Sequence, residues 1–126
     1  MLQIREEQMA LFESSAEDGF MQRLLHHLHT NHPEQVDGLS QQALRARAQY
    51  GVEVARGYGV HGEAALTAFV ALMFVVSPDF HTQPAINRVL EEMRFTPEQN
   101  FDDLFARTDD KDWEQAAKLG GTFPGA

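Results

Sequence analysis

Four of the six histidines in this chain, His26, His27, His29 and His32, fall within one seven-residue stretch. Imidazole binds zinc and titrates near neutral pH, so metal binding and a pH-sensitive switch are the two chemistries to weigh here. The sequence HHLHTNH follows none of the usual zinc spacings and lacks the His-Glu-x-x-His pattern of helical zinc sites. It is more typical of a solvated helix end, where histidines oppose the negative end of the helix dipole. We therefore expect no metal site.

The other groups that could carry catalysis lack the context that catalysis requires. Asp109, Asp110 and Asp112 form an acidic cluster without the central glycine and closing glutamate of a calcium loop. Thr108 before them indicates a helix start instead. No serine lies in a Gly-x-Ser-x-Gly sequence, and the chain has no cysteine to act as a nucleophile or thiolate ligand. These patterns predict a protein without enzymatic activity and without a cofactor.

The net charge of −9 is concentrated toward the two ends of the chain. Residues 1–38 contain seven acidic and two basic residues. Residues 39–90 contain three acidic and four basic residues, and residues 91–126 contain nine acidic and four basic residues. Binding to a phosphate backbone needs clustered lysine and arginine, so this distribution argues against a nucleic acid partner. It suits a basic protein partner as well as general solubility. The N-terminal sequence lacks a basic start followed by an apolar run, so we expect a cytoplasmic protein.

The longest apolar segment predicts the element around which the domain is built. Thirteen residues from Ala64 to Val76 contain Thr67 as their one polar side chain. As a helix they span about 20 Å, too short for a hydrocarbon core of about 30 Å. We therefore expect a buried central helix at about 62–77 and no membrane insertion. Its inaccessible residues are expected to be Leu66, Phe69, Val70, Met73 and Phe74.

Cap residues, prolines and apolar spacing predict the remaining helices. These helices are expected at 5–31, from Ser40 to about 56, from Pro84, from a capping box at 96–99 and from Thr108. No segment alternates with the period of two that a strand requires. The sequence thus predicts an all-α fold. We expect a single compact domain of five or six helices at residues 1–119, followed by a flexible C-terminal tail at residues 120–126.

Several short motifs occur together along most of the chain. They are I-R-x-E-Q-M near the start, His27-Leu28, A-R-x-Y-G, and L-M-F-V-x-x-P-D-F. This combination resembles a family of small uncharacterised bacterial proteins encoded near type VI secretion spike, PAAR or effector genes. The resemblance covers most of residues 1–107, and this chain departs from it at residues 60–63 and at Ser77-Pro78, where a glycine often stands. The matching residues are Ile4, Arg5, Glu7, Gln8, Met9, His27, Leu28, Ala55, Arg56, Tyr58, Gly59, Leu72, Met73, Phe74, Asp79 and Phe80.

The resemblance implies a protein that binds another bacterial protein: an effector, a toxin or a PAAR/spike protein. The expected function is that of a non-enzymatic accessory or chaperone-like protein for a type VI secretion effector or spike cargo. The alternative is an immunity protein that neutralises a cognate toxin by direct binding, since an acidic protein suits a basic toxin. An enzyme or toxin is a third class, which would require a cleft with perturbed titratable groups. The sequence leaves the oligomeric state open.

Two turns beside the central helix carry the residues expected to contact a partner. Each turn, 58–61 and 79–81, offers an aromatic ring beside a polar neighbour, a combination that protein interfaces favour. The two turns come close together if this helix packs antiparallel to its neighbours, but we expect them at its two ends, about 20 Å apart at the helical rise. The alternative is that the two aromatic residues simply cap the core. The predicted protein-binding residues are Tyr58, His61, Asp79 and Phe80.

Overall fold

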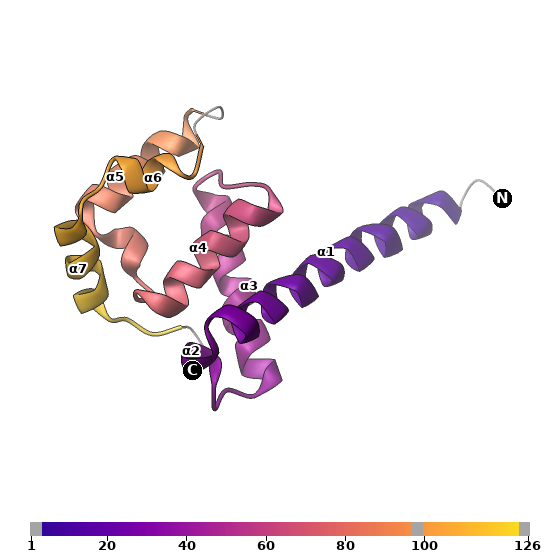
Figure 1. Cartoon of the computed structure of the whole chain (residues 1–126). Coiled ribbons are helices and arrows are strands. Elements are labelled where there is room, and N and C mark those ends of the chain that lie inside the picture. Colours follow the sequence, from indigo (N-terminus) through magenta and orange to yellow (C-terminus); the bar gives the residue numbers. More distant parts are fainter. Residues whose placement is uncertain (1–3, 97–99, 124–126) are drawn as a thin grey trace.

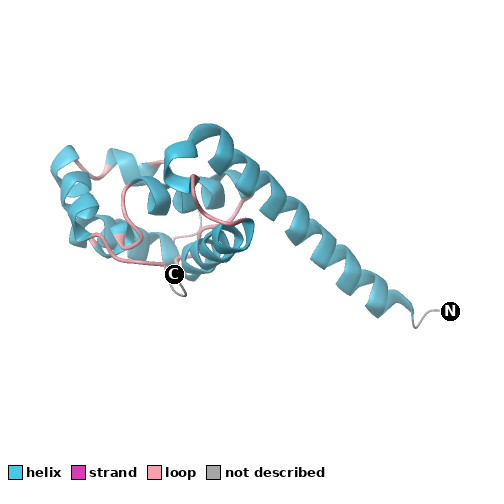
Figure 2. Ribbon diagram, turned by 90° about the horizontal axis from the view of Figure 1, so that it is seen from below, coloured by secondary structure: helices cyan, strands magenta, loops and turns pink. Residues whose placement is uncertain are grey.

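The chain is almost entirely helical. The computed structural model describes residues 4–96 and 100–123, with side chains from residue 16 on. These residues form seven α-helices and one short 3-10 helix, with no strand among them, which confirms the all-α prediction (Figures 1 and 2). The elements are α1 (Ile4–Asn31), α2 (Pro33–Val36), α3 (Gln41–Gly57), α4 (Glu63–Val75), η1 (Phe80–Thr82), α5 (Pro84–Arg94), α6 (Asp103–Ala106) and α7 (Asp110–Leu119).

α1 is the longest element, and its two halves have different surroundings. It contains 28 residues, which gives a length of about 42 Å. Figures 1 and 2 show its N-terminal half extending away from all the other helices. The C-terminal half packs on α3, α2 and α4. Of its described side chains, those buried in the core are Phe20, Met21, Leu24 and Leu28.

Ion pairs attach α1 to its neighbours near the point where it meets the domain body. Glu17 pairs with Arg56 of α3 at 3.2 Å. Six residues further on, Arg23 makes a two-pronged pair with Glu63, the first residue of α4, at 2.7 and 2.8 Å. This pair lowers the pKa of Glu63, mainly because the guanidinium donates hydrogen bonds to the carboxylate. All of these side chains are exposed, so they orient α1 more than they stabilise it.

α4 lies at the centre of the domain, as the apolar run predicts. Leu66, Phe69, Val70 and Met73 are at most 5 % exposed, which confirms four of the five expected core positions. The fifth, Phe74, is half-buried. The helix occupies 63–75, slightly inside the predicted 62–77. Of the helices in the described part of the chain, none combines the length and apolar content needed to cross a membrane.

A glycine allows α3 and α4 to approach closely. Gly51 is buried in the middle of α3. A Cβ atom at this position would lie 3.1 Å from Val70 Cγ2 and 3.1 Å from Met73 Sδ. Contacts that short are tighter than normal packing, so Val70 and Met73 would have to shift by a few tenths of an ångström to accommodate a side chain at residue 51.

Helix ends follow the local signals in most places. The Ser40 hydroxyl accepts a hydrogen bond from the Ala43 amide at 3.1 Å, and Pro84 is the first residue of α5. α7 is capped by Asp109 in a reciprocal capping box with Asp112, one residue after the predicted Thr108. His32-Pro33 ends α1 as expected. Pro33 then begins α2, a short helix that the sequence analysis does not predict.

The predicted fifth helix is shorter than expected. Its proposed capping box at 96–99 includes residues 97–99, which lie outside the described residues. Phe101 is in a turn, and α6 begins only at Asp103 and contains four residues. Phe101 and Leu104 are nevertheless buried, so this segment contributes to the core without forming a long helix.

η1 and α7 pack against each other on the far side of α4 from the N-terminal half of α1. The Ser77 hydroxyl donates to the carbonyl of Ala116 at 2.8 Å, and the Gln83 amide donates to Gln115 Oε1 at 3.0 Å. The Trp113 indole stacks on Phe80 with 5.9 Å between ring centroids. These contacts fix α7 to the turn that follows α4.

The chain after α7 returns to the domain body. Figure 1 shows it crossing from α7 toward α2. Phe123 is 7 % exposed, and its ring lies 4.9 Å from that of Phe74. Phe123 is therefore buried against α4, and the flexibility of residues 120–126 remains a prediction. Residues 124–126 lie outside the described residues.

Candidate functional site

The four residues predicted to bind a partner do not form one surface. Phe80 is fully buried and Tyr58 is 9 % exposed, so both belong to the core, as the alternative interpretation held. Phe80 cannot contact a partner while this packing persists. His61 is exposed, whereas Asp79 is only partly exposed because Gly121 covers its carboxylate. Of the four, His61 is the most accessible.

One residue from each turn lies much closer to the other turn than the distance of about 20 Å expected for the two ends of the helix. The rings of Tyr58 and His81 are 5.9 Å apart between centroids. Both rings also contact Phe69, at 6.2 and 6.0 Å, halfway along α4. The reason is that η1 folds back along α4 after Pro78, while Tyr58 reaches the same ring from the end of α3. Tyr58 and His81, one residue from each turn, therefore meet in the core, whereas His61 is exposed.

His81 is the most unusual polar residue in this cluster, and the sequence analysis does not single it out. It is 8 % exposed, and among the described residues its Nδ1 atom has no hydrogen-bond partner. Burial lowers the pKa of His81, because a charged imidazolium loses its hydration there, and the nearby Asp79 partly offsets the effect. The imidazole is therefore held in its neutral form by an aromatic environment.

Asn87 connects the parts of this cluster. Its side-chain amide donates to the Tyr58 hydroxyl at 3.1 Å and to the carbonyl of His81 at 3.2 Å. The pKa of Tyr58 is raised, first because its ring is buried and second because Glu91 is nearby. The Arg94 guanidinium lies over the Tyr58 ring, 5.2 Å from its centroid. Both titratable groups thus stay neutral at neutral pH, and the arrangement is suited to packing more than to proton transfer.

The histidines at the end of α1 are spread over different surroundings. The Asn31 side-chain amide donates to His27 Nδ1 at 3.1 Å, and the His27 ring lies 5.7 Å from that of His32. His26 is exposed and lies 3.5 Å from the Thr30 hydroxyl. Within the described ranges, no three His, Asp or Glu side chains are grouped where one metal ion would bind them.

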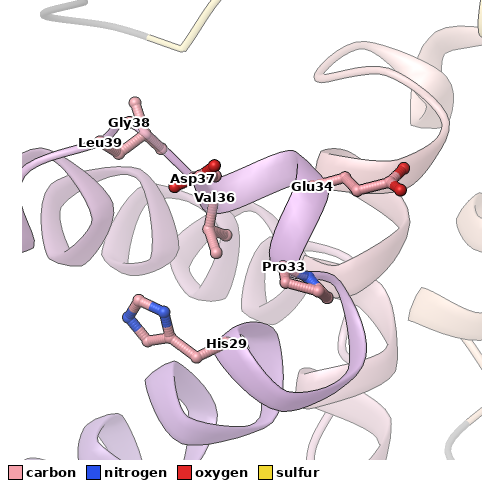
Figure 3. Close-up of a pocket in the computed structure, with 7 residues that line it drawn as sticks. All are labelled: His29, Pro33, Glu34, Val36, Asp37, Gly38 and Leu39. Atoms are coloured by element: carbon pink, nitrogen blue, oxygen red, sulfur yellow. The ribbon is translucent and has the colours of Figure 1, made fainter.

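His29 lines a surface hollow of about 430 Å³ between the end of α1 and the start of α3 (Figure 3). The other lining residues are Pro33, Glu34, Val36, Asp37, Gly38 and Leu39. Figure 3 shows the Glu34 carboxylate pointing away from the His29 imidazole, so these two groups do not converge on one point. A smaller hollow of about 190 Å³ lies beside His61 and is bordered by Asn100 and Phe101.

The projecting half of α1, residues 4–16, is the remaining candidate for recognition. Its backbone is helical and extends beyond the domain body (Figures 1 and 2). The projecting half has Ile4, Met9 and Phe12 in its sequence, so it is not purely polar.

Comparison of the chain with protein families, with curated proteins and with solved structures finds no match. The functional interpretation therefore depends on the geometry described above and on the resemblance in the sequence motifs.

Proposed function

We propose that this protein is a non-enzymatic accessory or chaperone-like protein that binds a type VI secretion effector or spike cargo. The observation that carries the proposal is the projecting half of α1, residues 4–16. A helix that extends from a folded body is available to enter a groove on a partner, with apolar side chains about one turn apart as anchors. Met9 and Phe12 have that spacing.

Charge supports a protein partner with a basic surface. The projecting half contains Glu6, Glu7 and Glu13 against the single Arg5. Acidic residues around apolar anchors steer association with a positively charged partner and suppress contacts with acidic ones. The same net charge opposes binding to nucleic acid. The partner we propose is therefore a protein whose groove is apolar at its base and basic at its rim.

The test is to measure binding of the effector that the resemblance places near this protein's gene, by isothermal titration calorimetry. Replacing Met9 and Phe12 together by glutamate should weaken binding by about thirtyfold, the loss expected when interface anchors are removed. The charge control is Gln22→Glu, which adds one of the two negative charges at an exposed position in the anchored half of α1. Melting temperatures of both variants should match that of the wild type. Unchanged binding of the Met9/Phe12 variant would exclude the projecting half as the contact element.

The acidity of this chain also favours the second candidate, an immunity protein that neutralises a cognate toxin. Co-expression separates the two functions. If the protein restores the viability of cells that express the neighbouring toxin, it acts in immunity. If it raises the solubility or delivery of the effector without protecting cells, it acts as an accessory protein.

A further inference from the structure

The turn between α2 and α3 contains an aspartate followed by a glycine, Asp37 and Gly38. Both residues are exposed and line the hollow shown in Figure 3. The Leu39 amide donates to the Val36 carbonyl at 3.2 Å, so residues 36–39 form a β-turn. The φ of −62° and ψ of 136° at Asp37, followed by a φ of 86° at Gly38, make it a type II turn. This turn needs a positive φ at its third residue, which glycine adopts without strain.

The peptide unit between Asp37 and Gly38 is free to rotate within this turn. Among the described residues, neither the Asp37 carbonyl nor the Gly38 amide takes part in a backbone hydrogen bond. A Cβ atom on Gly38 would meet no atom beyond its chain neighbours within 4 Å, so nothing obstructs the rotation. The ion pairs of the described side chains do not include the Asp37 carboxylate. The Gly38 nitrogen and the Asp37 side chain can therefore approach each other.

We propose that Asp37-Gly38 is a modification site, at which aspartate isomerises spontaneously to isoaspartate and becomes the substrate of a methyltransferase that esterifies isoaspartyl residues. In the first step the Gly38 nitrogen attacks the side-chain carboxyl carbon of Asp37. A C–N bond forms, and the carboxyl hydroxyl leaves as water with the amide proton. The five-membered succinimide then takes up one water, and ring opening at the main-chain carbonyl leaves the chain running through the Asp37 side-chain carbonyl.

The isomerised residue changes both the turn and its chemistry. Isoaspartate adds one methylene group to the backbone between Val36 and Leu39, so the type II geometry and the hydrogen bond across it are lost. It also presents a free α-carboxylate, whose oxygen attacks the methyl carbon of a sulfonium donor while the donor leaves as a thioether. The Gly38 nitrogen then expels methanol from this ester and re-forms the succinimide. Repeated cycles therefore restore part of the aspartate.

A second Asp-Gly pair, Asp18-Gly19, serves as an internal control because it lies within α1. In a helix the Gly19 amide donates to the carbonyl four residues earlier. The Asp18 carboxylate accepts a hydrogen bond from Arg45 at 3.0 Å. Both interactions must break before the ring can form. Isomerisation at Asp37 should therefore be at least about tenfold faster than at Asp18 in the folded protein, because the helix must first open locally.

The experiment incubates the full-length wild-type protein at physiological temperature in water labelled with heavy oxygen. Each succinimide that hydrolyses takes one labelled oxygen atom into the residue. Tryptic digestion in ordinary water separates the two sites into peptides of residues 6–23 and 24–45, in which mass spectrometry locates label and isoaspartate. We expect label to accumulate at Asp37 at least about tenfold faster than at Asp18. In concentrated urea, where the chain is unfolded, the two rates should be similar.

Variants connect the isomerisation to methylation. Aged wild-type protein should accept radioactive methyl groups from S-adenosylmethionine and a purified isoaspartate methyltransferase. Asp37→Glu keeps the negative charge but would have to form a less favourable six-membered ring, so methyl incorporation should fall to the level that Asp18 contributes. Asp18→Glu, the matched control, should leave methyl incorporation nearly unchanged.

The proposal is overturned if Asp37 and Asp18 take up label at the same rate in the folded protein, or if neither takes up label. It is also overturned if the ratio of the two rates in urea equals the ratio in the folded protein, because the local sequence and not the turn would then set the rate. Methyl incorporation into Asp37→Glu equal to that of the wild type would contradict it as well.

Discussion

Phe69 offers the most direct test of the proposed core. It is fully buried in α4 and is surrounded by four other rings. The centroid distances are 5.0 Å to Phe80, 6.0 Å to His81, 6.2 Å to Tyr58 and 6.2 Å to Phe101. Replacing a buried phenylalanine by alanine typically costs about 3–5 kcal/mol. Because Phe69 makes several aromatic pairs, we expect a value at the upper end, about 4–5 kcal/mol.

That loss is large compared with the stability of a domain, which is about 5–15 kcal/mol. For a chain of this length it corresponds to a decrease in melting temperature of about 15–20 °C, at about 4 °C per kcal/mol. Urea unfolding followed by circular dichroism gives the free energy of unfolding, and the fluorescence of Trp113 provides a second probe. The matched control is Phe95→Ala at the end of α5, where the side chain is 79 % exposed. Its effect should be within about 0.5 kcal/mol. Equal urea midpoints for the two variants would refute the placement of Phe69 at the centre of the core.

Three further predictions concern pH, helix packing and capping. Burial lowers the pKa of His81 below its usual value near 6.5, so the unfolded chain binds a proton at this histidine more readily than the folded chain does. The free energy of unfolding should therefore fall as pH decreases through about 6.5 toward the folded-state pKa. His81→Leu should reduce this loss, measured as urea midpoints from about pH 7 to about pH 5; an identical pH profile would contradict it. Gly51→Val should lower the free energy of unfolding by about 1–3 kcal/mol, because side chains of α4 lie 3.1 Å from the added Cβ atom. Gly57→Ala adds a Cβ atom in open space and should have a much smaller effect in the same urea assay. Asp109→Ala should cost about 1 kcal/mol and increase amide exchange in α7 through loss of the capping box; unchanged exchange would exclude a stabilising cap.

Features that depend on local sequence were predictable. The burial of α4 follows from its apolar composition, and the starts of α3 and α5 follow from Ser40 and Pro84. The same property of proline explains why the short helix α2 was not predicted. Pro33 disfavours helix in the residue before it but is itself well suited to the first turn of a new helix, so it both ends α1 and begins α2.

Features that depend on contacts between distant segments were not predictable. Phe74 has the spacing of a core residue, but its shielding comes from Phe123, 49 positions later in the chain. The helical rise of α4 predicts Tyr58 and His81 near its opposite ends, and the sequence does not decide whether packing with neighbouring helices brings them together. The return of η1 toward Phe69 brings them together, and no periodicity in the sequence signals that return. The partner-binding role of Tyr58, His61, Asp79 and Phe80 remains a prediction, except that Phe80 is buried.

The attachment of α1 at one end changes the thermodynamics of its other end. Starting a helix is the unfavourable step, with a nucleation constant of about 10⁻³, equivalent to about 4 kcal/mol. In this protein, the packed residues from Glu17 onward have already met that requirement, so residues 4–16 only extend an existing helix. An isolated peptide of the same residues would have to nucleate for itself. The folded domain therefore acts as a template for the helix of its own N-terminal segment. If a partner recognises this helix, the peptide alone should bind it up to about a thousandfold more weakly than the whole protein does.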